Sequence, residues 1–315
     1  MKYRKLGKNG PEISEIGFGS WAIGGGWSSG WGDQDDQISS ESVRAALDAG
    51  VTFYDTAAVY GLGHSEVVIG QALKGDRNKV ILATKCGLVW DENGKTSKNG
   101  TFDSIIREAE ASLRRLGTDY IDLYQMHWPD TDMNASAEET MRAMDKLVQE
   151  GKVRYVGVSN YNIAQLEESL TVRHVDALQP PYSILRHAAE KELLPFCQEK
   201  GIGVVGYSSL TSGLLSGNYT YDTKFDASDW RSRNAAHIGE GLKKNVDRAE
   251  KLKVIASRFD LTLPQLAVAY TLAHPALTSA IVGVRKPSHI TSVLPAVDVR
   301  LDETTLAEIR EIAAS

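Results

Sequence analysis

The sequence has little cysteine and no long apolar run. Only two of its 315 residues are cysteines, Cys86 and Cys197, which excludes a disulfide framework and favours a reducing compartment. No run approaches the ~18 apolar residues that a membrane-spanning helix requires. The first residues, MKYRKLGKNG, contain no apolar signal segment. We therefore expect a cytoplasmic protein that does not interact with membranes.

Basic clusters and metal-binding motifs are also absent. The 35 Lys and Arg residues are outnumbered by 41 Asp and Glu residues, which gives a net charge of -6 and argues against nucleic acid as a partner. The seven histidines form no H-E-x-x-H pattern and the cysteines no C-x-x-C pattern, so no metal site is expected. A globular chain of this length needs neither a metal nor a disulfide to fold.

Eight short apolar runs alternate with longer amphipathic segments. The first of these segments is expected to begin at Ser39 or Ser40 as the helix cap and to end at Gly50. Strands that alternate with helices predict βαβ units and a parallel sheet. With no linker to divide the chain, eight units favour one (β/α)8 TIM barrel, with residues 1–315 as a single domain, over two doubly wound domains. The runs span residues 16–19, 52–56, 80–85, 119–127, 153–160, 175–179, 203–209 and 279–284.

Three regions interrupt this alternation. Residues 3–14 have the pattern of a hairpin that closes the bottom of the barrel, with a turn at Asn9-Gly10. Residues 210–240 form a long polar loop after the seventh strand, and loops of that length are commonly functional. Two helical patterns, 242–259 and 263–273, precede the eighth strand, one helix more than the plain fold requires.

Four polar residues stand at or just after the ends of the second, third and fourth strands: Asp55, Tyr60, Lys85 and His127. Barrel enzymes carry their catalytic side chains at the carboxyl ends of the strands. Any one of these residues alone is commonly a packing or ion-pairing residue. Their occurrence together favours a catalytic site.

The four residues have the chemistry needed to protonate a carbonyl oxygen. A tyrosine hydroxyl, with a pKa of about 10, is a weak acid, and the Lys85 cation is expected to lower the pKa of Tyr60 while Asp55 keeps Lys85 charged. A neutral His127 would donate an N–H to the carbonyl oxygen. Because no side chain supplies a hydride, a nicotinamide cofactor is implied.

Five motifs, in this order, resemble the aldo-keto reductase superfamily: DTAAVYGLGHSE (55–66), ATKCG (83–87), TDYIDLYQMHWPD (118–130), GKVRYVGVSN (151–160) and LQPPYS (178–183). The similarity extends from residue 1 to about residue 310 and is greatest to bacterial general-stress and inositol-operon reductases. It implies an (α/β)8 barrel, NADPH in preference to NADH, and reversible reduction of an aldehyde or ketone. Tyr60 would be the general acid, tuned by Lys85 and Asp55, and His127 would orient the substrate.

The resemblance also implies where the cofactor binds. Tyr207 would stack on the nicotinamide ring, although it could instead be a core aromatic residue. The carboxamide of the nicotinamide would be bound by Ser159, Asn160 and Gln179. The nicotinamide end of the cofactor would lie near Asp55, Gly19, Ser20 and Trp21. The residues over the pyrophosphate would be Ser208, Leu210, Ser212 and Gly213, with a charge from Arg231 or, equally, Arg233.

The segment IVGVRKPSHI (281–290) resembles the part of the family that binds the 2′-phosphate of NADPH. Gly283 and Arg285 would contribute here, with Lys286 as a point charge. A solvated basic turn is the alternative. Relatives commonly have Gln at the position of His289 and Asn at that of Val293, so the strength of the NADPH preference stays open. His289 predicts a phosphate affinity that depends on pH near 6.5.

Aromatic residues are expected around the substrate. Trp21 and Trp128 flank Tyr60 and His127 and resemble the family's substrate-binding aromatic residues. Three others would either extend this pocket or, as we expect, take packing or surface positions: Trp27, Trp31 and Trp90. An aromatic pocket with few charges favours a small carbonyl compound that is apolar, or neutral and hydroxylated.

Two functions of other classes stay open. Potassium-channel β-subunits resemble the same superfamily, so a cofactor-binding regulatory subunit is the main alternative. A metal-free hydrolase that uses Asp55 and a second carboxylate would be active without nucleotide. The sequence indicates no obligate protein partner, and a monomer is expected.

Overall fold

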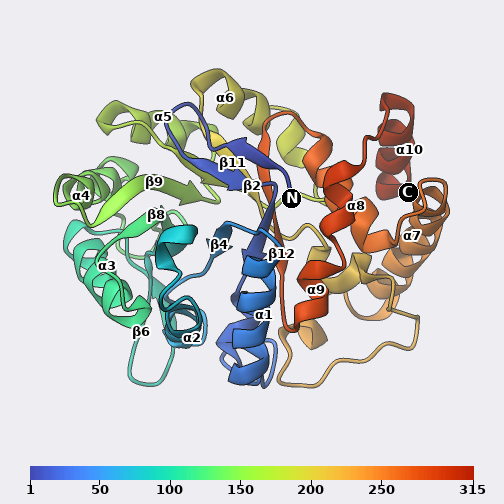
Figure 1. Cartoon of the computed structure of the whole chain (residues 1–315), viewed down its shortest axis with the longest axis horizontal. Coiled ribbons are helices and arrows are strands. Elements are labelled where there is room, and N and C mark those ends of the chain that lie inside the picture. Colours follow the sequence, from blue (N-terminus) through green and yellow to red (C-terminus); the bar gives the residue numbers. More distant parts are fainter.

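The structure, a computed structural model, describes residues 1–315. At its centre is a closed barrel with the strand order β10-β11-β12-β3-β4-β5-β8-β9. Figure 1 labels β4, β8, β9, β11 and β12 of this barrel. The eight strands are β3 (Ile16–Gly19), β4 (Phe53–Asp55), β5 (Ile81–Cys86), β8 (Ile121–Met126), β9 (Val153–Ser159), β10 (Ala177–Gln179), β11 (Gly203–Gly206) and β12 (Leu277–Gly283). Each falls within or overlaps one of the predicted runs, and the predicted (β/α)8 fold is confirmed.

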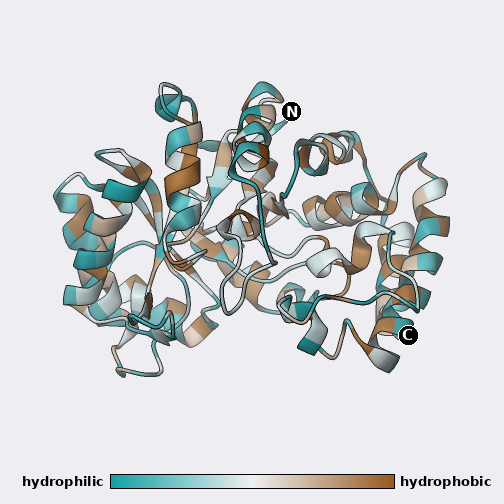
Figure 2. Ribbon diagram, turned by 90° about the horizontal axis from the view of Figure 1, so that it is seen from below, coloured by the Kyte–Doolittle hydropathy of each residue, from teal (hydrophilic) through white to brown (hydrophobic).

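Helices surround the barrel and bury their apolar faces against it. A hydrophobic core of 62 buried residues joins strands and helices, and α3, for example, buries Ile105, Ala109 and Leu113. In Figure 2 the helices carry both hydrophobic and hydrophilic residues, as expected for helices that bury one face and expose the other. The helices are α1 (Asp36–Asp48), α2 (His64–Ala72), α3 (Phe102–Leu116), α4 (Ala137–Gln149), α5 (Ile163–Val172), α6 (Leu193–Lys200), α7 (Gly239–Ser257), α8 (Leu263–Ala273), α9 (Pro287–Thr291) and α10 (Glu303–Ala314).

Helix α1 begins earlier than predicted. The Asp35 side chain caps it by accepting a hydrogen bond from the Ile38 backbone N–H at 2.9 Å, so the predicted start at Ser39 or Ser40 is wrong. The Ser39 hydroxyl instead donates to the Asp35 carbonyl at 2.8 Å. The predicted end is confirmed, because Gly50 follows the helix with φ +81, a conformation that glycine adopts without strain.

A hairpin closes the bottom of the barrel, as predicted. Strands β1 (Tyr3–Lys5) and β2 (Glu12–Ser14) pair antiparallel. Leu6 and Ile13, from the turn and second strand of this hairpin, are fully buried in a cluster with barrel residues that include Phe53 and Val205. Because this end of the barrel is filled with apolar side chains, only the carboxyl end remains open to a ligand.

The carboxyl end carries the longer insertions. Strands β6 (Leu88–Trp90) and β7 (Thr96–Lys98) form a second hairpin. The predicted 210–240 loop contains only the short helical turns Thr211–Ser216 and Trp230–Arg233 before α7 begins, and α7 and α8 then both precede β12 as expected. The remaining short turns are Trp21–Gly24, Arg77–Lys79, Ala188–Glu190 and Leu294–Asp298.

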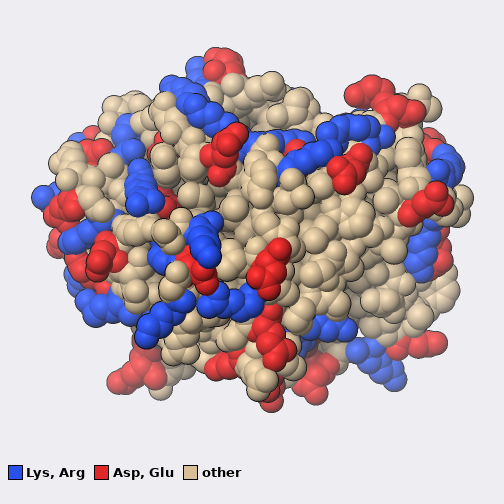
Figure 3. Space-filling view, in the orientation of Figure 1, with Lys and Arg blue, Asp and Glu red and all other residues tan.

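The outer surface is mixed in charge. On the face drawn in Figure 3, Lys and Arg side chains are interspersed with Asp and Glu side chains, and no broad basic area forms. None of the helices combines the length and the apolar composition needed to cross a membrane.

Candidate active site

A cavity of about 810 Å³ opens at the carboxyl end of the barrel. Asp55, Tyr60 and His127 line it, together with residues that follow β3, β9, β10, β11 and β12. Cavities of this size suit cofactors and small-molecule substrates. The cavity is therefore where the predicted site residues converge.

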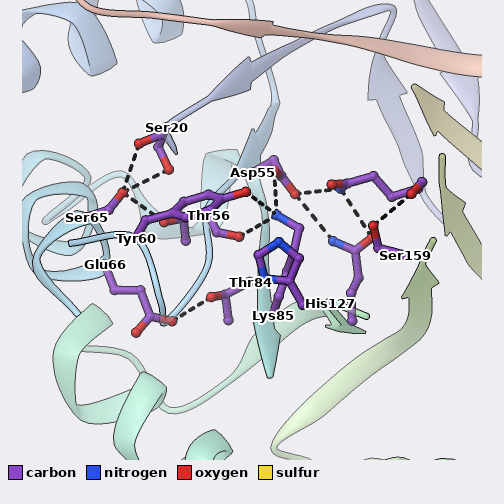
Figure 4. Close-up of polar contacts among 12 residues, drawn as sticks. Ser20, Asp55, Thr56, Tyr60, Ser65, Glu66, Thr84, Lys85, His127 and Ser159 are labelled. Carbon is purple, nitrogen blue, oxygen red and sulfur yellow. Dashed lines mark hydrogen bonds and ion pairs between the residues drawn. The ribbon is translucent and has the colours of Figure 1, made fainter. Parts of the chain in front are cut away.

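Lys85 links the predicted catalytic residues (Figure 4). Its Nζ donates to Asp55 Oδ2 at 2.7 Å and to the Thr56 carbonyl at 2.8 Å, and lies 3.5 Å from Tyr60 Oη. Lys85 is 1% exposed and Asp55 3% exposed. A buried pair of opposite charges with further hydrogen bonds is a costly arrangement to break, so this ammonium is held in one place beside the tyrosine hydroxyl.

Two glutamine side chains support Asp55 from inside the barrel. Gln179 Nε2 donates to Asp55 Oδ1 at 2.8 Å, and Gln125 Nε2 donates to the same oxygen at 3.3 Å. Gln179 is therefore next to the catalytic residues as well as lining the cavity. Gln125 was not predicted, although a polar residue inside the buried strand β8 is a signal that could have identified it.

His127 is held in its neutral form. Burial lowers the pKa of its imidazole well below the ordinary value, and the nearby Lys85 cation lowers it further. Its ring lies 5.7 Å from the ring of Tyr60. A neutral imidazole carries one N–H, so His127 is able to donate a hydrogen bond to an oxygen placed near Tyr60.

The expected lowering of the pKa of Tyr60 is wrong for this arrangement. Burial raises the pKa of the Tyr60 hydroxyl well above its ordinary value, and the Asp55 carboxylate raises it further. The physical reason is that burial dominates, and the Lys85 charge, paired with Asp55 at 2.7 Å, does not offset the desolvation of the tyrosine hydroxyl. The hydroxyl is consequently protonated and available as a proton donor.

The loop that carries Tyr60 is anchored from behind by a second buried network. Glu66 accepts a hydrogen bond from Thr84 Oγ1 at 2.5 Å and one from Arg115 Nε at 2.6 Å. On the other side of the loop, Gly61 has φ +61, and a Cβ there would lie 2.1 Å from the Gly24 carbonyl oxygen. Only glycine permits this approach, which joins the Tyr60 loop to the loop after β3.

The residues predicted to bind a carboxamide form a hydrogen-bonded group. Ser159 Oγ donates to the Gln179 carbonyl at 2.8 Å, Asn160 Nδ2 donates to the His127 carbonyl at 3.0 Å, and Tyr207 Oη donates to Asn160 Oδ1 at 2.9 Å. The cavity is lined by Ser159, Asn160, Gln179 and Tyr207. Tyr207 also packs against the inner barrel cluster, so it is both a core contact and part of the cavity wall.

The 210–240 loop and its start form one side of the cavity. Arg231 lines it and Arg233 does not. The Arg231 guanidinium is fully engaged, with Nε 3.0 Å from Asp229 Oδ1 and Nη1 2.7 Å from Tyr219 Oη. It therefore brings little uncompensated charge to the cavity. The predicted residues Ser208, Leu210, Ser212 and Gly213 all line the same side.

The end of β12, the strand next to β11 in the barrel, forms another part of the cavity wall. Gly283, Arg285, His289 and Val293 line the cavity, whereas the predicted Lys286 does not. Arg285 donates to Gln34 Oε1 at 3.1 Å and to the Asp33 carbonyl at 2.9 Å and forms no ion pair. A Cβ on Gly283 would meet no atom within 4 Å, so the backbone there borders open space.

Tryptophan residues form a further part of the cavity wall. The Trp21 ring lies 6.3 Å from the Tyr60 ring and 5.6 Å from the Trp230 ring, and Gly19, Ser20 and Trp128 also line the cavity. Trp27 and Trp31 line it too, which agrees with the alternative that they extend the pocket, while Trp90 lies outside. Trp230 was not predicted, and its position in the long polar loop was the only available signal.

No group of three or more His, Cys, Asp or Glu side chains is arranged to hold a metal ion.

A model of the "Aldo/keto reductase family" matches residues 15–314. The aldo-keto reductase YhdN of Bacillus subtilis (strain 168) is 39% identical over 293 residues, covering 92% of this chain and 87% of the relative. The NADH-specific methylglyoxal reductase of Escherichia coli (strain K12) is 36% identical over 326 residues, covering 99% of this chain and 98% of the relative.

Two further similarities bear on function. A probable voltage-gated potassium channel subunit beta of Oryza sativa subsp. japonica is 32% identical over 316 residues, covering 95% of this chain and 92% of the relative. Among solved structures, the glycerol dehydrogenase AKR11B4 from Gluconobacter oxydans superposes with a TM-score of 0.89 at 34% identity, covering 99% of this chain and 94% of that one.

Proposed function

We propose a specific reaction for this chain, which belongs to the aldo/keto reductase family: the reversible reduction of an aldehyde or ketone with NADPH, in which Tyr60 is the general acid. The observation that carries the proposal is the buried Lys85–Asp55 pair, with its ammonium 3.5 Å from Tyr60 Oη, at a cavity that His127 also lines. The proposal treats residues 1–315 as one barrel domain in the cytoplasm.

The residues around the cavity fit a dinucleotide. Amide and hydroxyl groups of Ser159, Asn160 and Gln179 surround one end and match the donors and acceptors of a carboxamide. Tyr207 presents a ring at that end, and the open space over Gly283 leaves room for a ligand against the backbone at the other. When bound, the nicotinamide supplies the hydride that the carbonyl carbon accepts.

The side chains would carry out the remaining steps. Neutral His127 donates an N–H to the substrate carbonyl oxygen and orients it. Tyr60 then donates its hydroxyl proton to that oxygen, which completes the alcohol and leaves a tyrosinate. The Lys85 ammonium stabilises the tyrosinate, and the Asp55 carboxylate and the Thr56 carbonyl keep the ammonium aimed at it. Alcohol oxidation follows the same path in reverse.

Arg285 supports the choice of NADPH over a weaker use of NADH. Its guanidinium lines the cavity without a carboxylate partner, and a planar guanidinium is well suited to a phosphate. The methylglyoxal reductase of Escherichia coli is NADH-specific by name, so the choice needs a direct measurement.

The tryptophan wall supports a small neutral or hydroxylated carbonyl compound as the substrate. Trp21, Trp31 and Trp230 pack on one another next to Tyr60. The predicted substrate-contacting residues Trp21, Tyr60, His127 and Trp128 include no charged side chain, because His127 is neutral. The names of two relatives, a methylglyoxal reductase and a glycerol dehydrogenase, agree with a small oxygen-rich substrate.

A cofactor-binding regulatory subunit is the second candidate, because of the similarity to a probable potassium channel subunit beta. The complete Asp55–Tyr60–Lys85–His127 group favours the enzyme. A panel of aldehydes and ketones with NADPH and with NADH, followed by absorbance at 340 nm, tests the proposal. Turnover with NADPH supports it. Nucleotide binding with negligible turnover, together with a stoichiometric protein partner on pull-down, would favour the regulatory subunit instead.

A further inference from the structure

Arg186 is the cation of the cavity that has no partner. Three arginines line the cavity, Arg186, Arg231 and Arg285. Arg231 is paired with Asp229, and Arg285 donates to the Gln34 side chain and the Asp33 carbonyl. The guanidinium of Arg186 makes no hydrogen bond or ion pair, and the only carboxylate that lines the cavity, Asp55, is paired with Lys85.

The backbone holds Arg186 in a defined position although its side chain is exposed. Ser183 and Arg186 exchange two backbone hydrogen bonds, at 3.1 and 3.0 Å, in a tight turn after β10. The buried Ser183 hydroxyl lies 3.0 Å from the Thr211 hydroxyl, which ties this turn to the beginning of the 210–240 loop. Leu185 packs against the cluster of Leu214, Leu242 and Val246.

Arg186 lines the cavity, and its charge affects two titratable side chains nearby. Burial raises the pKa of Tyr207 to about 12, and the Arg186 cation acts against that rise. Burial lowers the pKa of His237, and Arg231 and Arg186 lower it further. His237 Nε2 lies 3.4 Å from the Ser212 carbonyl. The Arg186 charge therefore acts both on Tyr207, at the proposed nicotinamide end, and beside Ser212 in the loop.

We propose that Arg186 binds the pyrophosphate of the dinucleotide, while Arg285 binds its 2′-phosphate. This inference rests on the proposed function. A dinucleotide that extends from Tyr207 to Arg285 passes Ser212 and Gly213 with its pyrophosphate, and Arg186 is the uncompensated charge on that stretch. The predicted cation, Arg231, is already neutralised by Asp229. A planar guanidinium donates several N–H groups to phosphate oxygens at once.

A carboxylate on the substrate is the other anion that Arg186 could meet. The substrate wall, however, consists of Trp21, Trp31 and Trp128 next to Tyr60 and His127. Arg186 instead belongs to the turn tied to Thr211, the residue directly before Ser212 and Gly213. The position therefore favours the pyrophosphate.

The test measures ligand affinity by isothermal titration calorimetry, without turnover. The ligands are NADPH, NADH and adenosine 2′-monophosphate, which has the 2′-phosphate but no pyrophosphate. We expect Arg186→Gln to weaken the binding of NADPH and of NADH by the same factor, about tenfold, the usual effect of a lost hydrogen bond to a charged group. The affinity for adenosine 2′-monophosphate should not change. Arg186→Lys, which keeps the charge, should recover part of the affinity.

Two variants serve as controls. Arg285→Gln should show a different pattern. It should weaken the binding of NADPH and of adenosine 2′-monophosphate and leave the affinity for NADH unchanged. Arg114→Gln removes an exposed arginine on α3 outside the cavity and should change none of the three affinities. The thermal midpoint of each variant should match that of the parent.

Three outcomes would overturn the inference. An unchanged NADH affinity in Arg186→Gln rejects the pyrophosphate contact, and an equal loss for adenosine 2′-monophosphate shows that Arg186 acts on the adenosine end. Unchanged nucleotide affinities with a raised KM for a carboxylate-bearing aldehyde would assign Arg186 to the substrate. If the parent protein itself binds neither NADPH nor NADH, the proposed function fails, and this failure is distinct from a difference between parent and variant.

Discussion

The two ends of the cavity differ in how they hold charge. At the Tyr60 end, Lys85 and Asp55 are 1% and 3% exposed and lie 2.7 Å apart. Elsewhere along the cavity, Arg285 and Arg186 are accessible cationic groups without a carboxylate partner. The first arrangement is complete without a ligand, and the second is not.

This difference matches the different roles proposed for the two regions, proton transfer at the Tyr60 end and ligand binding at the arginines. A proton donor works best from a fixed position that excludes water. There its electrostatic interactions with charged neighbours are strong, and these neighbours need not rearrange during the reaction. An anion-binding residue gains from a charge that the protein leaves uncompensated, because the ligand then supplies the counter-charge. We therefore expect substitutions at the Tyr60 end to change kcat, and substitutions at the arginine end to change affinity.

The largest effect should come from Tyr60→Phe. Loss of the hydroxyl removes the proposed proton donor and should lower kcat about 10³-fold, within the range for general acid catalysis. Steady-state kinetics with a carbonyl substrate measures this change. The NADPH dissociation constant should stay within about twofold of the parent value. A kcat that remains within tenfold of the parent would reject Tyr60 as the acid.

Lys85→Met should reduce both activity and stability. It leaves the Asp55 carboxylate buried without its cation, and such a loss typically costs about 3–5 kcal/mol of unfolding free energy. Denaturant unfolding measures this cost. The double variant Asp55→Asn/Lys85→Met should regain most of the stability but none of the activity. If the double variant were also active, the pair would be structural only.

Arg285→Ala tests the other end of the cavity. NADPH affinity should fall about tenfold or more, while NADH affinity should change by less than about threefold because NADH lacks the 2′-phosphate. At saturating NADPH, kcat should stay near the parent value. Equal losses for the two nucleotides would remove Arg285 from the 2′-phosphate site and weaken the comparison between the two ends.

The smallest effect concerns His289. Burial lowers the pKa of its imidazole, and the Lys286 and Arg285 cations lower it further, so His289 takes up its proton at a lower pH than an ordinary imidazole does. The protonated form attracts phosphate, so the ratio of NADPH to NADH affinity should rise a few-fold on going from pH 8 to pH 6. His289→Ala should abolish that rise. The same rise in parent and variant would exclude His289.

Much of the site was predictable because strand ends are predictable. Asp55 and His127 follow apolar runs directly, and parallel strands bring their carboxyl ends to one edge of the barrel. The structure brings these residues together with Lys85 and Tyr60 as expected. The single domain and the monomeric state stay predictions.

Loop positions were predicted less well. Lys286 and Arg285 are neighbours in the sequence, yet only Arg285 lines the cavity, and Trp27 and Trp31 line it against expectation. The direction of a loop side chain depends on contacts made far away in the sequence, such as those of Arg285 with Gln34 and Asp33. No local pattern encodes these contacts.

The sequence by itself determined the barrel and placed Asp55, Tyr60, Lys85 and His127 at or near its strand ends, because hydrophobic periodicity and strand ends are local properties. Only the tertiary structure decided which charges are compensated. Asp229 neutralises Arg231 two residues away, Asp55 neutralises Lys85 across two strands, and Arg186 is left without a partner. Compensation depends on distances of a few ångströms between side chains, and folding sets those distances.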